Sequence, residues 1–91
     1  MIQTGRFRVY AGETPCELID VEVTGPRVTI DGPIWCGHGL LLRGVYVGAF
    51  VDRVGGGSGN HRVCQRTPDT LDVTAEFDGG LRCELTWRSE E

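Results

Sequence analysis

The sequence contains no lysine, and all nine of its basic side chains are arginine. A GC-rich coding background produces this bias without selection on the protein, and we favour that explanation. It points to a high-GC bacterium or a phage of one. Exclusion of lysine to escape its chemical modification is the alternative explanation.

The sequence also lacks a long apolar run and an apolar leader. The longest apolar run, Leu40 to Val54, is interrupted by charged residues and is shorter than the ~20 residues that cross a bilayer. The first residues, Met1 to Arg6, have no apolar core of the signal-peptide kind. We therefore predict a protein of the bacterial cytoplasm with no membrane partner, in which the four cysteines stay reduced or bind metal.

A basic surface is missing as well. The net charge is −4, which argues against a sequence-independent grip on nucleic acid. The acids are concentrated in residues 67–91, which hold seven acids and two arginines. Forty per cent hydrophobic and 24% charged residues are typical of a folded chain, and 91 residues suffice for one domain, 1–91, with a modest core. Fourteen glycines favour turns over long helices.

The clearest local pattern lies in residues 71–88. Apolar and polar residues alternate on both sides of Asp78-Gly79-Gly80, which predicts a β-hairpin. A three-residue loop at 78–80 pairs residue 77 with 81, 75 with 83, 73 with 85 and 71 with 87, and so leaves one face wholly apolar. A second hairpin is predicted over residues 16–31, where Val23 faces Val28 and Val21 faces Ile30 across Gly25-Pro26.

Residues 40–54 are ambiguous between two strands and a single short helix. Glycines at 44 and 48 and the β-branched or aromatic residues between them favour strands, with Arg43-Gly44 as the turn. The next segment, 55–60, is rich in glycine and is predicted to be a flexible loop. Together with strands near 6–11 and 61–66, these elements predict a mainly antiparallel all-β fold, a small single-domain barrel or sandwich of about seven short strands.

Metal-ligand residues occur in two short groups, Cys36-x-His38 and His61-x-x-Cys64. Two cysteines and two histidines can form a tetrahedral zinc site. Residues 36 and 38 share one face of an extended chain, whereas 61 and 64 share a face only if the chain bends. A zinc-binding β domain is therefore one hypothesis, and its alternative is that the cysteines are small buried hydrophobes and the histidines lie in loops.

The segment Trp35-Cys36-Gly37-His38-Gly39 resembles the Trp-Cys-Gly-His-Cys active site of disulfide isomerases, with Gly39 in place of the second cysteine. The resemblance covers five residues and implies a monothiol redox role for Cys36. The βαβ pattern of that family does not precede it. A cysteine-dependent enzyme, with Cys36 or Cys64 as nucleophile and His38 or His61 as base, is a related alternative.

Two surfaces are candidates for binding another protein. The first is the glycine-rich loop and the arginines that follow it: Gly55, Gly56, Gly57, Ser58, Gly59, Asn60, Arg62 and Arg66. The second is the acidic face of the last hairpin, formed by Asp72, Glu76 and Glu84. With no catalytic set or cofactor loop in the pattern, we predict a non-catalytic protein-binding module, such as a phage- or mobile-element-encoded inhibitor of a host protein. Its apolar strand faces are more than one thin sheet can hide, which predicts either a closed barrel or a homodimer formed through the central strands.

Overall fold

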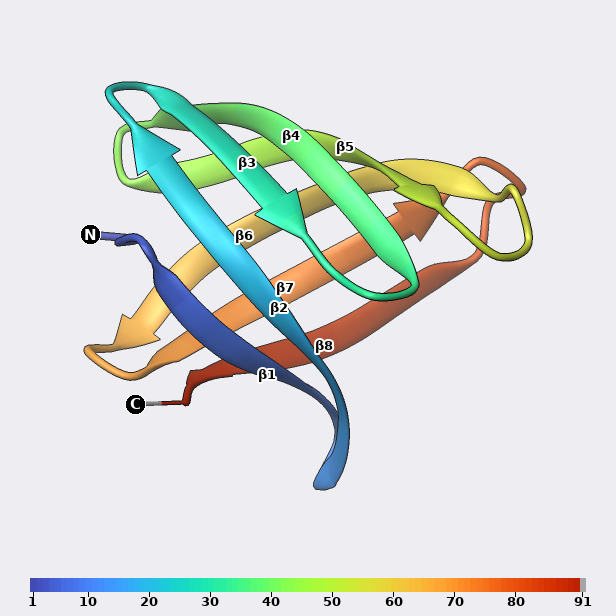
Figure 1. Ribbon diagram of the computed structural model, residues 1–91, viewed down its shortest axis with the longest axis horizontal. Helices are drawn as coiled ribbons and strands as arrows, with labels where there is room; N and C mark the ends of the chain where they lie inside the picture. The colour runs from blue at the N-terminus through green and yellow to red at the C-terminus, as the bar shows by residue number, and fades with distance from the viewer. Residues whose placement is uncertain (91) are drawn as a thin grey trace.

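The computed structural model describes residues 1–90, which form a closed barrel of eight antiparallel strands (Figure 1). Each strand pairs with the next along the chain, and β1 closes the barrel against β8. The strands are β1 (Gly5–Ala11), β2 (Thr14–Thr24), β3 (Arg27–Asp31), β4 (Trp35–Leu42), β5 (Val45–Asp52), β6 (Ser58–Thr67), β7 (Thr70–Phe77) and β8 (Arg82–Ser89). The predicted all-β barrel is confirmed, with eight strands rather than about seven.

Both predicted hairpins have the register that the alternation requires. In the last hairpin Leu71 lies opposite Trp87 and Ala75 opposite Cys83, and the amide of Phe77 donates to the carbonyl of Leu81 at 2.7 Å. In the β2–β3 hairpin Val23 lies opposite Val28 and Val21 opposite Ile30. The apolar face of each hairpin lines the barrel interior.

The ambiguous segment 40–54 is not a helix: it belongs to the β4–β5 hairpin. Arg43 and Gly44 form its two-residue turn, and both have positive φ, 52° and 79°. A two-residue turn with positive φ at both residues has a backbone twist that matches the twist of the two antiparallel strands it joins. None of residues 1–90 forms a helix long and apolar enough to cross a membrane.

The predicted flexible loop at 55–60 is too long. Ser58, Gly59 and Asn60 already belong to β6, which leaves residues 53–57 as the connection. Gly59 is buried in the wall opposite Phe50, and a Cβ atom there would collide with the Phe50 ring and with the backbone carbonyl of Glu76. Gly59 is therefore required by close packing of β5, β6 and β7, not by loop flexibility.

The two ends of the barrel differ in their connections. At one end, the covered end, two-residue turns join β2–β3, β4–β5 and β6–β7, and both termini lie on this side (Figure 1). The N-terminal segment packs there, and its Ile2 is only 2% exposed. At the other end, the mouth, residues 12–13 form a two-residue turn between β1 and β2, and the other three connections, β3–β4, β5–β6 and β7–β8, are longer (32–34, 53–57 and 78–81). The mouth is the end at which a hollow lined by aromatic rings opens into the barrel.

Candidate ligand-binding site

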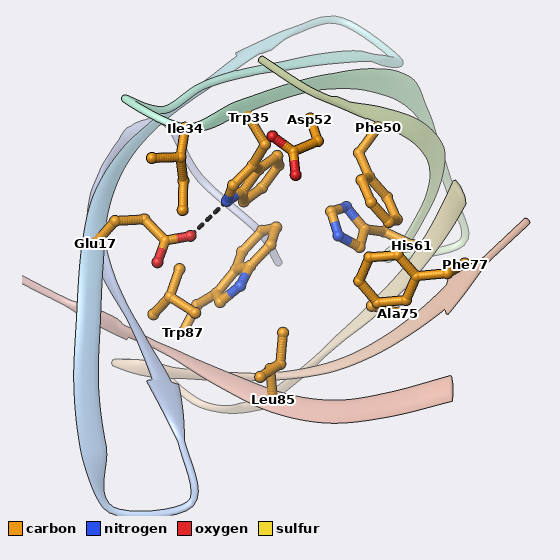
Figure 2. Close-up of a pocket in the computed structure, with 11 residues that line it drawn as sticks. Glu17, Ile34, Trp35, Phe50, Asp52, His61, Ala75, Phe77, Leu85 and Trp87 are labelled. Atoms are coloured by element: carbon orange, nitrogen blue, oxygen red, sulfur yellow. Dashed lines mark hydrogen bonds between the residues drawn. The ribbon is translucent and has the colours of Figure 1, made fainter. Parts of the chain in front are cut away.

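A cavity of about 210 Å³ opens into the barrel at the mouth (Figure 2). Its walls come from seven of the eight strands, all but β3, and from the β3–β4 connection. The lining residues are Val9, Glu17, Ile34, Trp35, Phe50, Asp52, His61, Ala75, Phe77, Leu85 and Trp87. An eight-stranded barrel has an interior just wide enough to be filled by side chains or to hold one small ligand, and here part of it is left open.

Aromatic rings form much of the cavity wall. His61 stacks on Phe50 with ring centroids 4.3 Å apart and planes inclined by 17°. Trp35 meets His61 edge-on at 4.9 Å and lies 5.9 Å from Trp87. Phe77 packs edge-on against the outer side of this group, 5.2 Å from Phe50. These contacts hold each ring in place, so the cavity is largely preformed.

Two carboxylates stand at the rim. Glu17 on β2 accepts a hydrogen bond from Nε1 of Trp35 at 2.5 Å, as Figure 2 shows. Asp52, at the end of β5, accepts hydrogen bonds on Oδ1 from the amides of Val54 and Gly55 at 2.7 and 3.1 Å. These two bonds favour the charged form and lower the pKa of the Asp52 carboxyl below its usual value. Asp52 is therefore an anion at neutral pH.

His61 is the one buried ionisable side chain of the cavity. It is 5% exposed, and burial lowers its pKa from 6.5 to about 4, so the imidazole is neutral at pH 7. Its Nδ1 has no hydrogen-bond partner, and neither has Nε1 of the neighbouring Trp87. Figure 2 shows the edge of His61 that carries its two nitrogens turned toward the open centre. Enclosed polar atoms without partners are rare in folded proteins and call for an explanation.

The residues of the predicted zinc site do not converge. His61 points into the barrel, whereas Cys36 and His38 lie on the outer face of β4, with His38 exposed, and Cys64 is out of phase with His61 on β6. Within residues 1–90 there is no group of three or more histidine, cysteine, aspartate or glutamate side chains that could hold a metal ion. Zinc binding stays a prediction that metal analysis of the purified protein tests.

The segment that resembles a disulfide-isomerase active site is part of strand β4, in an antiparallel barrel without the βαβ unit of that fold. All four cysteines are half-buried free thiols. Cys36 lies opposite Val51 on β5 and Asp31 on β3. The redox and nucleophile roles suggested for this cysteine stay untested predictions.

The two predicted protein-binding surfaces are on the outside of the barrel. Gly55, Gly56 and Gly57 lie in the β5–β6 connection at the mouth, and Arg62 is exposed on β6. The acidic face is partly neutralised, because Asp72 pairs with Arg66 through an Nε–Oδ2 contact of 3.0 Å. Its other members, Glu76 and Glu84, are exposed on β7 and β8.

Sequence reasoning missed the cavity, although a signal for it was present. Glu17, Asp52 and His61 each lie on the side of their strand that faces the barrel interior. Glu17 shares this side with Ile19 and Val21, Asp52 shares it with Phe50, and His61 shares it with Val63. An ionisable residue on the apolar face of a strand either finds a partner in the interior or marks a functional site.

No protein-family model, curated protein or solved structure matches the chain.

Proposed function

We propose that this protein binds a small molecule in the mouth of its barrel and does not catalyse a reaction. The observation that carries the proposal is the preformed cavity with aromatic walls and a few polar groups, since small-molecule sites are concave, mostly apolar and hold a small number of placed polar atoms. At about 210 Å³ the cavity is smaller than the ~300–1,000 Å³ of pockets for drug-sized ligands. Its ligand is therefore a small one, of about one ring.

The two unpartnered nitrogens at His61 and Trp87 add to this support. Each enclosed donor or acceptor without a partner costs roughly 1–3 kcal/mol of stability. A side chain retained at such a cost fits a binding role, because functional sites are where proteins keep locally unfavourable arrangements.

The two tryptophans provide the test, because the chain has only two and both line the cavity. Two indole N–H signals are therefore expected in a ¹⁵N–¹H spectrum, assigned with Trp35→Phe and Trp87→Phe. Titration with 2-phenylethanol, a neutral one-ring probe, is expected to shift both signals in a saturable way. If the indole signals stay unmoved while the probe shifts other residues, the cavity is not the binding site.

A matched pair of variants on β7 gives the control. Ala75 is buried and lines the cavity, so Ala75→Met fills it and is expected to weaken probe binding at least about tenfold. Thr74→Met adds the same side chain at the neighbouring position on the outer face and is expected to leave binding unchanged. Equal loss in both variants would indicate a general effect on the fold.

A role in binding another protein remains a second proposal, supported by one surface. The outer face of the β4–β5 hairpin exposes four apolar side chains, Leu40 (47%), Leu42 (56%), Val47 (44%) and Val51 (52%). Leu40 lies directly opposite Val47, with Leu42 next on the same face of β4, and a second copy of the chain can cover this face symmetrically. If the protein is a dimer in solution, Val47→Glu is expected to make it a monomer by sedimentation. A dimer that survives this change would exclude the patch.

A further inference from the structure

The cavity carries negative charge that no salt bridge within residues 1–90 neutralises. Its lining contains two carboxylates, Glu17 and Asp52, and no arginine. The salt bridges found within residues 1–90 join Asp20, Asp31, Asp72 and Glu90 to arginines, and neither rim carboxylate is among them. His61 adds no positive charge, because its imidazole is neutral at pH 7.

The rim carboxylates also keep free hydrogen-bonding capacity. Glu17 uses one oxygen for Trp35, and Asp52 uses Oδ1 for both of its backbone donors. A carboxylate accepts about four hydrogen bonds through its two oxygens, so each has acceptor sites left for a ligand. An anionic ligand would meet repulsion here, whereas a ligand with N–H donors and positive charge would find acceptors.

Beneath the rim, the wall suits the body of such a ligand. The faces of Trp35, Trp87 and Phe50 attract a positive charge electrostatically, and their area removes apolar surface from water. The unpartnered Nδ1 of the 95%-buried His61 and Nε1 of the 99%-buried Trp87 lie in the same wall. The charge at the rim and the aromatic rings below it both favour a cation, whereas the unpartnered nitrogens mark the cavity as a polar site without selecting the charge of its ligand, since the indole N–H of Trp87 is a donor.

We infer that the ligand of this cavity is a small organic cation, an ammonium group joined to an apolar body of about one ring, as in an arylalkylamine. The ammonium lies between Glu17 and Asp52 at the rim, and the ring lies against Trp87, Phe77 and Leu85. This inference rests on the proposed small-molecule binding and adds the charge and chemical class of the ligand.

Three probes of one shape and different charge test the inference. Phenethylamine is a cation, 2-phenylethanol is neutral and phenylacetate is an anion at pH 7, and each has one phenyl ring on a short chain. Titration of the two indole signals gives a dissociation constant for each. Phenethylamine is expected to bind at least about tenfold more tightly than 2-phenylethanol, and phenylacetate is expected to bind most weakly.

Near-isosteric variants locate the origin of the preference. Glu17→Gln and Asp52→Asn keep an oxygen for Trp35 and for the two backbone amides, so both are expected to preserve the local structure. The double variant is expected to bind phenethylamine at least about tenfold more weakly and 2-phenylethanol equally well. Glu22→Gln removes a charge from the exposed face of the same strand as Glu17 and serves as the control.

The outcomes separate this inference from the proposed function. Equal binding of all three probes, or tightest binding of phenylacetate, would overturn the cation and leave small-molecule binding in place. A preference for phenethylamine that persists in the double variant would also overturn it, because the charge would act from elsewhere. Failure of all three probes to move either indole signal would overturn both proposals.

Discussion

The covered end and the mouth of the barrel are built from the same alternating strands but are filled in different ways. Toward the covered end the interior is packed with Ile2, Val28, Val63 and Leu71, each at most 2% exposed. At the mouth the inward positions hold aromatic rings and ionisable groups around open space. A hollow of about 170 Å³ also exists near the covered end, but it lies by the N-terminal segment and its lining is mostly polar.

The difference indicates a division of roles along the barrel axis. Dense aliphatic packing provides most of the stability of a small domain, because buried apolar area contributes roughly 25 cal/mol per Å². A cavity with unpartnered nitrogens contributes less and keeps room for a ligand. We therefore expect the packed aliphatic side chains of the covered end to contribute more to stability than the side chains around the cavity.

Matched leucine truncations test this division and have the largest expected effect. Leu71→Ala, at the start of β7 near the covered end, is expected to lower the free energy of unfolding by about 3 kcal/mol, since Leu71 is only 2% exposed and the loss of its side chain enlarges the hollow that it lines beside the N-terminal segment. Leu85→Ala, in the cavity wall, is expected to cost less than about 1.5 kcal/mol, because one side of Leu85 already faces open space. Urea unfolding of both variants measures the two values.

Equal losses at Leu71 and Leu85 would contradict the division of roles. They would mean that the mouth is as tightly packed as the covered end when the protein is in solution. A change in the slope of the unfolding curve against urea would point instead to an altered unfolded or native state.

The next largest effect is expected from pH. Burial lowers the pKa of His61 from 6.5 to about 4 in the folded state, so between these values the unfolded chain takes up a proton that the folded protein does not. Stability is therefore complete above about pH 6.5, falls as the pH is lowered toward 4, and levels off below that. The full change corresponds to about 3 kcal/mol for this residue.

Variants at the two histidines isolate this effect from the titration of carboxyl groups. His61→Gln is expected to remove the loss between pH 6.5 and 4, measured by urea unfolding at several pH values. His38→Gln, on the exposed outer face of β4, is expected to retain it. A pH profile that is the same in wild type and His61→Gln would show that the imidazole is not buried in solution.

The fold was predictable because apolar and polar residues alternate strictly along most strands of the barrel. One face is buried and the other is solvated, so the apolar phase of residues 71–88 and 16–31 fixes both the strand and its register. The β4–β5 hairpin was harder to predict because its outer face is also apolar, which removes the alternation. Of its glycines, Gly39 and Gly48 face inward and make room for the Tyr46 ring, whereas Gly44 forms the turn.

The site was not predictable in the same way. Cys36 and His38 share the outer face of β4, whereas His61 points into the barrel and Cys64 lies on the opposite face from it, so pleating keeps the four metal-ligand residues apart. Glu17 and Trp35 are 18 residues apart and meet only because the barrel closes around them. The only sequence signal for the cavity is that Glu17, Asp52 and His61 fall at inward-facing positions of their strands. This signal becomes informative once the strand registers are known.

A smaller effect is expected at Tyr46, which sharpens the comparison between the ends. Its ring lies over Gly39 and Gly48, where a Cβ atom would collide with it, and its enclosed hydroxyl has no hydrogen-bond partner. Burial raises the pKa of this hydroxyl to about 12, so the phenol stays neutral. Tyr46→Phe is expected to raise the free energy of unfolding by about 1 kcal/mol, because an unpaired hydroxyl is removed from the interior.

The same substitution on the outside provides its control. Tyr10→Phe, where Arg88 packs over the ring at 4.6 Å, removes a hydroxyl that burial does not enclose and is expected to change stability by less than about 0.5 kcal/mol. If Tyr46→Phe lowers stability instead, the hydroxyl has a partner in solution, such as a buried water. The covered end would then also contain a polar site.

The smallest effect is expected at the β4–β5 turn of the covered end. Arg43 has a φ of 52°, a conformation that costs most residues about 1 kcal/mol and that asparagine adopts more readily. Arg43→Asn is therefore expected to raise the free energy of unfolding by about 0.5 kcal/mol, whereas Arg43→Gln removes the same charge and is expected to give no gain. A gain in both variants would assign the effect to charge. A gain in Arg43→Asn alone would show that the backbone conformation of this turn limits the stability of the covered end.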